Sequence, residues 1–347
     1  MTEKTNAPSW KKFFQDNLMR IISIVSIVVL SVAVNTVKGG FLKVASISGI
    51  LSYCAPLMIM AVGMTSILMF GSIDLSLGSL CSVCNVLFVR LISLFQEDYT
   101  AQGVEEFPIF TIMLASVSAC VVMGALSGLL LGLIHVKLKV PSFITSLGFM
   151  SVWTSAAYLI SDKAEPIAKK MYGCTNWYKI TFFGKLLPLP FVLAVVIAIV
   201  VFILQKKTVF GRTIFSIGGN ERAARVSGMN VDRTKIIIFS LGGACAALGG
   251  IFLACSIRSS DPNIGDSYTM MLVASCVLGG TALSGGKGSA LGTVLGALAI
   301  AVIKKGLVHV GNYIDPYLQD VAFGFFVLVM IILSIDRSKA TRGIAVK

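Results

Sequence analysis

Few residues of this chain could do chemistry, and Asp74 is the most unusual of them. It lies in the stretch GSIDLSLGS (71–79), and no other charged residue occurs within residues 44–89. A carboxylate at the centre of a membrane costs a few kcal/mol or more, so it must be buried in protein, face water or cap a helix. Asp74 could therefore line a polar path together with Ser76 and Ser79. It could equally cap the following helix by accepting bonds from the amides of Ser76 and Leu77.

Motifs for catalysis or metal binding are scarce. CSVC at 81–84 has redox or metal-ligand spacing, but it lies in an apolar stretch, and only His135 and His309 could join it. We interpret these cysteines as small buried hydrophobic residues. The glycine-rich GGTALSGGKGS (279–289) lacks the order of a P-loop and the strand that must precede one. We therefore predict that the chain is not an enzyme, has no catalytic residue and no metal site, and binds no cofactor.

Composition predicts the elements that position these residues. Apolar residues make up 56% and charged residues 13% of the chain, with a mean hydropathy of +0.89, whereas a soluble domain is about a quarter charged. Since a helix that crosses a membrane needs about 20 apolar residues, we predict an all-α polytopic membrane protein with about ten transmembrane helices. The uncharged runs are 21–37, 44–73, 75–89, 107–136, 140–161, 186–205, 236–257, 267–286, 288–303 and 321–335.

Lysine and arginine gather before the first run and after the last, and short cytoplasmic loops carry such an excess. Both termini are therefore predicted to be cytoplasmic, as an even number of crossings requires. The loop 162–185 would lie outside although it carries several lysines. The predicted organisation is a single transmembrane domain. Its parts are a tail (1–20), a first half (21–205), a cytoplasmic loop (206–235), a second half (236–335) and a second tail (336–347).

The net charge of +13 could suggest a nucleic-acid partner. The basic residues, however, are scattered along the membrane edges and are not interleaved with stacking aromatic residues. We interpret the charge as a topology signal combined with contact to anionic membrane lipid, and we expect no nucleic acid.

Two glycine-rich breaks interrupt the apolar runs. GSIDLSLGS and GGTALSGGKGS share a G-x-x-x-L-S frame followed by Gly-Ser. A broken helix frees backbone groups that only protein or water can satisfy in a bilayer, and corresponding breaks in two halves point to a transporter's path. The pattern indicates a possible internal repeat; the alternative is a chance similarity of Gly/Ser-rich turns.

The basic loop predicts a short surface helix at 220–228. Asn220 has the preferred type for an N-cap, Glu221 would lie in the first turn, and Gly228 would end the helix. Such a helix between two spans suggests that a soluble partner docks on it. The alternative is a loop that is merely solvated.

Four segments together resemble the ribose-type permeases of bacterial ATP-binding-cassette importers, and the resemblance runs in order from about residue 20 to 336. It implies two copies of the permease, a cytoplasmic ATPase that uses the ATP, and an external or periplasmic sugar-binding protein. It also implies a multi-pass protein of the bacterial inner membrane. The segments are AVGMTSILMFGSIDLSLGS, VPSFITSLGFMSV, FGRTIFSIGGNERAARVSGMNVDRTKIIIFSLGGACAALGGI and VLGGTALSGGKGSALGTVLGA.

The resemblance also suggests roles for individual residues. The helix near 220–228 would be the coupling helix that contacts the ATPase. A neutral sugar would need weak hydrogen bonds and aromatic faces along its path, because a tight pocket opposes release. The coupling residues would be Arg212, Asn220, Glu221, Arg222, Arg225 and Gly228. The path residues would be Asp74, Ser76, Ser79, Phe143, Thr145, Thr281 and Ser284.

The chain departs from the family pattern at two places. Thr269 and Met271 occupy positions that are usually acidic, and Thr154 and Ser155 replace a usual Arg-Gly pair. The solute therefore stays open among a monosaccharide, a nucleoside, an autoinducer-like furanoside and a branched-chain amino acid, and the second permease could be a copy or a relative. Outside the family, the alternatives are an ion-coupled carrier, which would favour several intramembrane acids, and an intramembrane enzyme.

Overall fold

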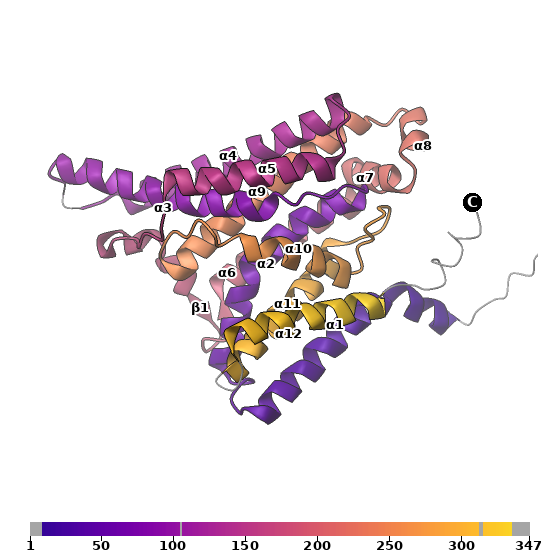
Figure 1. The fold of residues 1–347 in the computed structure, drawn as a ribbon, viewed down its shortest axis with the longest axis horizontal. Coiled ribbons are helices and arrows are strands. Elements are labelled where there is room, and N and C mark those ends of the chain that lie inside the picture. Colours follow the sequence, from indigo (N-terminus) through magenta and orange to yellow (C-terminus); the bar gives the residue numbers. More distant parts are fainter. Residues whose placement is uncertain (1–8, 105, 312–314, 335–347) are drawn as a thin grey trace, which may run out of the picture.

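Helices make up most of the computed structural model, which describes residues 9–104, 106–311 and 315–334 (Figure 1). Among these residues, eight helices are long and apolar enough to cross a membrane, which confirms the all-α polytopic class. They are α1 (Ser9–Val37), α2 (Val44–Met69), α3 (Leu77–Ala101), α4 (Ile109–Lys137), α5 (Ser142–Ile160), α6 (Leu189–Lys207), α9 (Val231–Ile257) and α11 (Ala290–Val310).

The two remaining apolar runs form α10 (Asp266–Leu278) and α12 (Pro316–Ser334). With 13 residues, α10 is about 20 Å long, too short to cross about 30 Å of hydrocarbon alone. The run predicted at 267–286 therefore divides into α10 and a loop. In contrast, α3 continues past Arg90, whose guanidinium lies 3.6 Å from the Glu97 carboxylate on the same helix. Of the predicted tails, residues 1–8 and 336–347 lie outside the described part.

Helix α9 lies at the centre and packs against α4, α2 and α3. Small residues permit this approach, because a Cβ added at Gly243 would clash with the carbonyl of Gly124, and one at Gly128 with the carbonyl of Phe239. On the α3 side, Gly250 lies equally close to the Cys81 carbonyl. Contacts between small residues are how helices associate in lipid, where apolar side chains gain little from burial.

The two ends of the molecule differ in structure. The lysine-rich loop after α5 forms two 3-10 helices, η1 (Lys169–Cys174) and η2 (Asn176–Lys179), and a hairpin of β1 (Thr181–Phe182) and β2 (Leu187–Pro188). At the opposite end lie two short helices, α7 (Val209–Gly219) and α8 (Glu221–Val226). Helix α1 begins and α12 ends on the side of α7 and α8 (Figure 1), as the predicted even number of crossings requires.

Candidate functional site

Helix α8 has the ends that its sequence predicts. The Asn220 side-chain oxygen accepts a hydrogen bond from the Ala223 amide at 3.0 Å, and Glu221 occupies the first turn, where the helix dipole favours an anion. Gly228 follows the helix with φ of +78°, a conformation that favours glycine. These contacts confirm the short helix predicted at 220–228.

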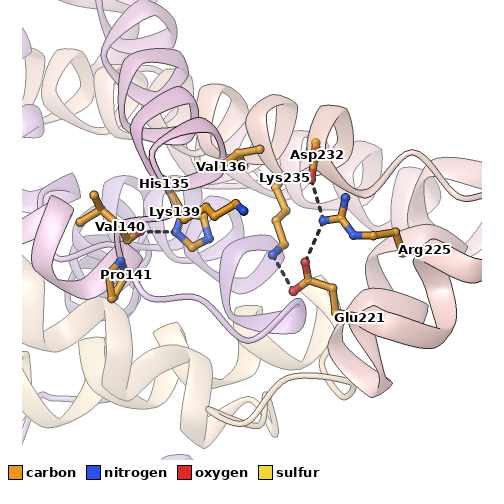
Figure 2. A pocket seen from close by; sticks show the side chains of 9 residues that line it. All are labelled: His135, Val136, Lys139, Val140, Pro141, Glu221, Arg225, Asp232 and Lys235. Atoms are coloured by element: carbon orange, nitrogen blue, oxygen red, sulfur yellow. Dashed lines mark hydrogen bonds and ion pairs between the residues drawn. The ribbon is translucent and has the colours of Figure 1, made fainter.

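Ion pairs hold α8 against the start of α9. The Arg225 guanidinium donates to Glu221 at 3.2 Å and to Asp232 at 2.8 Å, while Lys235 Nζ lies 2.8 Å from the other Glu221 oxygen (Figure 2). Partial burial raises the pKa of Glu221, but the bonds and charges of Lys235 and Arg225 outweigh it, so the pKa is lowered overall. Glu221 and Arg225 therefore face α9 and fix the position of α8.

A different set of residues forms the outer face of α8. Arg222 is exposed, Val226 is 85% exposed, and Ala224 on the opposite side is buried. Arg212 is exposed on the neighbouring helix α7. The predicted coupling residues thus divide into exposed arginines for which no ion pair is described, Arg212 and Arg222, and an ion network of Glu221 and Arg225 with α9 that is itself about half exposed. Sequence reasoning missed Val226, whose signal is an apolar residue four positions after Arg222 on a short polar helix.

A cavity of about 570 Å³ lies between α8 and the turn that joins α4 to α5 (Figure 2). Its walls carry charges of both signs, and Lys235 and Glu221 meet inside it. The turn is held by His135, whose Nδ1 lies 2.8 Å from the Val140 carbonyl oxygen. A soluble partner that binds α8 would meet this hollow beside it. The lining residues are His135, Val136, Lys139, Val140, Pro141, Glu221, Arg225, Asp232 and Lys235.

Helix α7 connects α8 to both glycine-rich breaks. The Gly286 amide donates to the Met69 carbonyl at 2.8 Å, and a Cβ added at Gly218 of α7 would clash with both groups. A Cβ at Gly285 would lie 2.8 Å from the Gly71 amide nitrogen. We call Gly71, Gly218, Gly285 and Gly286 the glycine junction. Backbone touches backbone there, so α7 packs directly against both breaks.

Asp74 lies in the first break, and its side chain bonds locally. Asp74 is 3% exposed, and its Oδ1 accepts from the Ser76 amide at 2.9 Å and from the Ser76 hydroxyl at 2.6 Å. The expected bond from Leu77 is replaced by the second bond from Ser76, because an aspartate at a turn reaches the backbone two residues on. Ser79 Oγ donates to the Ser76 carbonyl at 2.9 Å. These bonds hold the entry into α3.

The other segments predicted to line a path meet the first break. The Ile73 amide donates to Ser142 Oγ at 3.3 Å at the start of α5. On another side, a Cβ at Gly71 would lie 3.5 Å from the Ser284 carbonyl oxygen of the second break. The first break therefore contacts both α5 and the second break.

The predicted path side chains themselves face different surroundings. Phe143 is 49% exposed, and Thr145 bonds back to the carbonyl of Pro141. Thr281 is 3% exposed, whereas Ser284 is exposed. The structure thus brings the segments together without aligning these four side chains on one surface.

Gln205 is a further buried residue at the second break. It is 3% exposed, donates to Ser66 Oγ at 3.1 Å and accepts from the Ala290 amide at 3.0 Å. It therefore joins α6, α2 and the start of α11. From the sequence, Gln205 was placed only as the end of an apolar run. The feature that could have revealed it is a side-chain amide directly before Lys206, at the edge of a span.

Comparisons with known proteins give a consistent result. Residues 46–335 match the family described as "Branched-chain amino acid transport system / permease component". The chain is 32% identical to the ribose import permease protein RbsC of Bacillus subtilis (strain 168) over 341 residues, 98% of this chain and 99% of the relative. It is 30% identical to RbsC of Escherichia coli (strain K12), with coverages of 95% and 98%. It is 33% identical to the galactose/methyl galactoside import permease protein MglC of the same strain, with coverages of 84% and 87%. No solved structure matches the chain.

Proposed function

Because the chain belongs to this permease family, and within it to the ribose-type sugar permeases of ATP-binding-cassette importers, we propose that it carries a monosaccharide, ribose or a close relative, across the bacterial inner membrane. The similarity to ribose import permeases over nearly the whole of both chains supports this substrate class. Galactose and arabinose are the next candidates, since further relatives are named for them. The chain itself performs no covalent chemistry in this proposal.

The proposal assigns three protein partners to the chain. A cytoplasmic ATPase pair binds and uses the ATP, a sugar-binding protein delivers the sugar from outside, and a second permease, either a copy or a relative, completes the path. Each chain has one α8, so two permeases would match an ATPase pair. Two-fold pairing is the commonest closed arrangement of subunits. In this proposal, the side with α7, α8, the start of α1 and the end of α12 faces the cytoplasm.

In the proposed mechanism, the ATPase acts on the outer face of α8. The pairs of Arg225 with Asp232 and of Lys235 with Glu221 couple α8 to the start of α9 in this mechanism. Helix α7 then carries the displacement to the glycine junction, where it meets both breaks without intervening side chains. Movement of the breaks shifts the ends of α2 and α10 and the starts of α3 and α11. Weak contacts along the path let the sugar enter and leave.

ATP hydrolysis by the complex tests this function. The full chain is co-expressed with the cassette ATPase of a ribose importer from the same genome, and the purified complex is mixed with the sugar-binding protein of that importer. We expect the two proteins to co-purify and hydrolysis to rise when the binding protein carries ribose. The proposal is wrong if the ATPase does not associate with the chain, or if no sugar-loaded binding protein changes the rate.

A further inference from the structure

A cavity of about 240 Å³ lies at the second break, on the side of α7 and α8. The backbone of the loop 279–288 forms one wall, and Phe215 of α7 forms another. Three polar residues line the cavity: Arg20 of α1, and Lys287 and Ser289, which precede α11. Among the described residues that line it, none is acidic.

Ser289 provides the first sign that a ligand belongs in this cavity. It is 3% exposed, and its hydroxyl makes no hydrogen bond in the described structure. It occupies the N-cap position of α11, but its side chain makes no capping bond. A buried hydroxyl without a partner is unfavourable. The hydroxyl is therefore available to donate to a group in the cavity.

The start of α11 provides the second sign. The first amides of a helix lack partners within the helix, and the helix dipole makes this end positive, which favours an anion. Arg20 and Lys287 add two positive side chains at the same place. The Arg20 Nε atom lies 3.6 Å from the position of a Cβ at Gly292, in the first turn of α11.

We propose that this cavity binds a phosphate group. Lys287 and Arg20 would neutralise the charge, the Ser289 hydroxyl would donate one hydrogen bond, and the loop glycines would let the oxygens approach the backbone. Phosphate could come from the headgroup of an anionic phospholipid or from free phosphate in the cytoplasm. Arg20 directly precedes the apolar run of α1 and therefore lies at the membrane boundary, where headgroups occur. The loop is a static binding site and not a hydrolytic P-loop, and this proposal does not depend on the transported solute.

The site also has a mechanical consequence. Gly286 lines this cavity and belongs to the glycine junction, where its amide bonds to Met69. Phe215 lies on α7, three residues before Gly218. A bound phosphate would therefore hold α7, the second break and the start of α11 together. We expect binding to stabilise the folded protein.

Thermal unfolding of the purified full-length chain tests the proposal in two arms. In one arm, inorganic phosphate is titrated into protein in neutral detergent at constant ionic strength, with chloride as the matched salt. In the other, nanodiscs of phosphatidylcholine alone are compared with nanodiscs that contain phosphatidylglycerol. The variants are Lys287→Gln and Ser289→Ala, and the matched control is Lys207→Gln, an exposed lysine on the same side but outside the cavity.

The midpoint temperature of wild-type unfolding should rise in at least one arm. Lys287→Gln and Ser289→Ala should each raise the half-saturating ligand concentration about tenfold, equivalent to about 1.4 kcal/mol. The control should respond as wild type does. A rise with phosphatidylglycerol alone identifies a lipid headgroup, and a rise with phosphate alone identifies a free phosphate. Without ligand, Ser289→Ala should unfold at the wild-type temperature, because its hydroxyl has no partner to lose. No rise in either arm, or an equal loss of response in the control, would overturn the proposal.

Discussion

Asp74 illustrates how an apolar chain accommodates a single carboxylate. The sequence predicts a helix cap here, because a Gly-Ser break precedes the aspartate and a serine follows two residues later. The structure has both bonds from Ser76 and none from Leu77; Ser76 is the N-cap of α3 and no side chain caps the helix, so the predicted cap is wrong and Asp74 instead closes the turn before α3. The choice between these donors depends on backbone angles that residue types alone do not determine. A direct contact between Asp74 and a solute stays a prediction.

Substitutions at Asp74 distinguish a structural role of its bonds to Ser76 from a role of its charge in transport. Asp74→Asn keeps an oxygen that can accept from Ser76, so we expect a folded protein with partly reduced uptake. Asp74→Leu leaves buried donors unsatisfied and should lower the free energy of unfolding by about 1–3 kcal/mol, with nearly all uptake lost. Thermal unfolding and sugar uptake measure the two effects. If both variants were equally inactive and equally stable, transport would require the charge itself, and a structural role of the bonds to Ser76 would be ruled out.

At the scale of elements, local signals and distant contacts differ in how well they can be predicted. The ends of α8 were predictable because Asn220 and Gly228 act on their own backbone. The roles of Arg222 and Arg225 were not, since the partners that turn Arg225 inward come from α9. The glycine junction joins three segments that are distant in the chain, at Gly71, Gly218 and residues 285–286. Nothing in the residues around Gly218 indicates which backbone it touches.

The outer face of α8 should be required for coupling. Arg222→Glu combined with Val226→Asp reverses a charge and removes an exposed apolar contact. We expect stimulated ATP hydrolysis to fall about tenfold or more, because docking loses at least about 1.4 kcal/mol. The free energy of unfolding should change by no more than about 0.5 kcal/mol, as is usual for surface substitutions. Arg233→Glu, an exposed arginine outside α8, is the control; an equal loss there would indicate a general charge effect and would contradict the assignment.

Gly218 and Gly219 form a matched pair for the glycine junction. A Cβ at Gly218 would clash with Met69 and Gly286, whereas a Cβ at Gly219 meets nothing within 4 Å. Gly218→Ala should destabilise the protein by about 1–3 kcal/mol, the usual cost of overpacking, and should strongly reduce uptake. Gly219→Ala should match the wild type in thermal unfolding and in uptake. Similar behaviour of the two variants would show that contact at Gly218 does not link α7 to the breaks.

At the scale of the whole molecule, hydropathy predicts the all-α class and the order of the apolar helices, because each span must be apolar along its own length, but eight helices of the described chain are long enough to span where about ten were predicted. Hydropathy does not predict where a helix stops when charges lie beyond the membrane, and α3 accordingly extends to Ala101. It also does not reveal that α10 has only 13 residues, since the glycine-rich loop after it is equally uncharged. The internal repeat stays a prediction. Both ends of α10 are closely packed beside the breaks: Gly78 of α3 lies against the start of α10, and Gly292 of α11 lies against the end of α10.

The assembled transporter should contain two permeases for each ATPase pair. This stoichiometry follows from the proposed ATPase pair, in which each ATPase would bind the single α8 of one permease. Native mass spectrometry of the detergent-purified complex measures it directly, and identical or unlike permeases are distinguished by mass. A single permease with an ATPase pair would contradict the two-fold arrangement.

ATP-dependent sugar uptake tests the central claim most directly. Proteoliposomes hold the permease and the ATPase, with ATP inside and the sugar-binding protein with labelled ribose outside. Labelled ribose should accumulate inside only when both ATP and the binding protein are present, and ionophores that collapse ion gradients should leave the rate unchanged. Accumulation without ATP, driven by an imposed ion gradient, would contradict the account and identify the chain as an ion-coupled carrier.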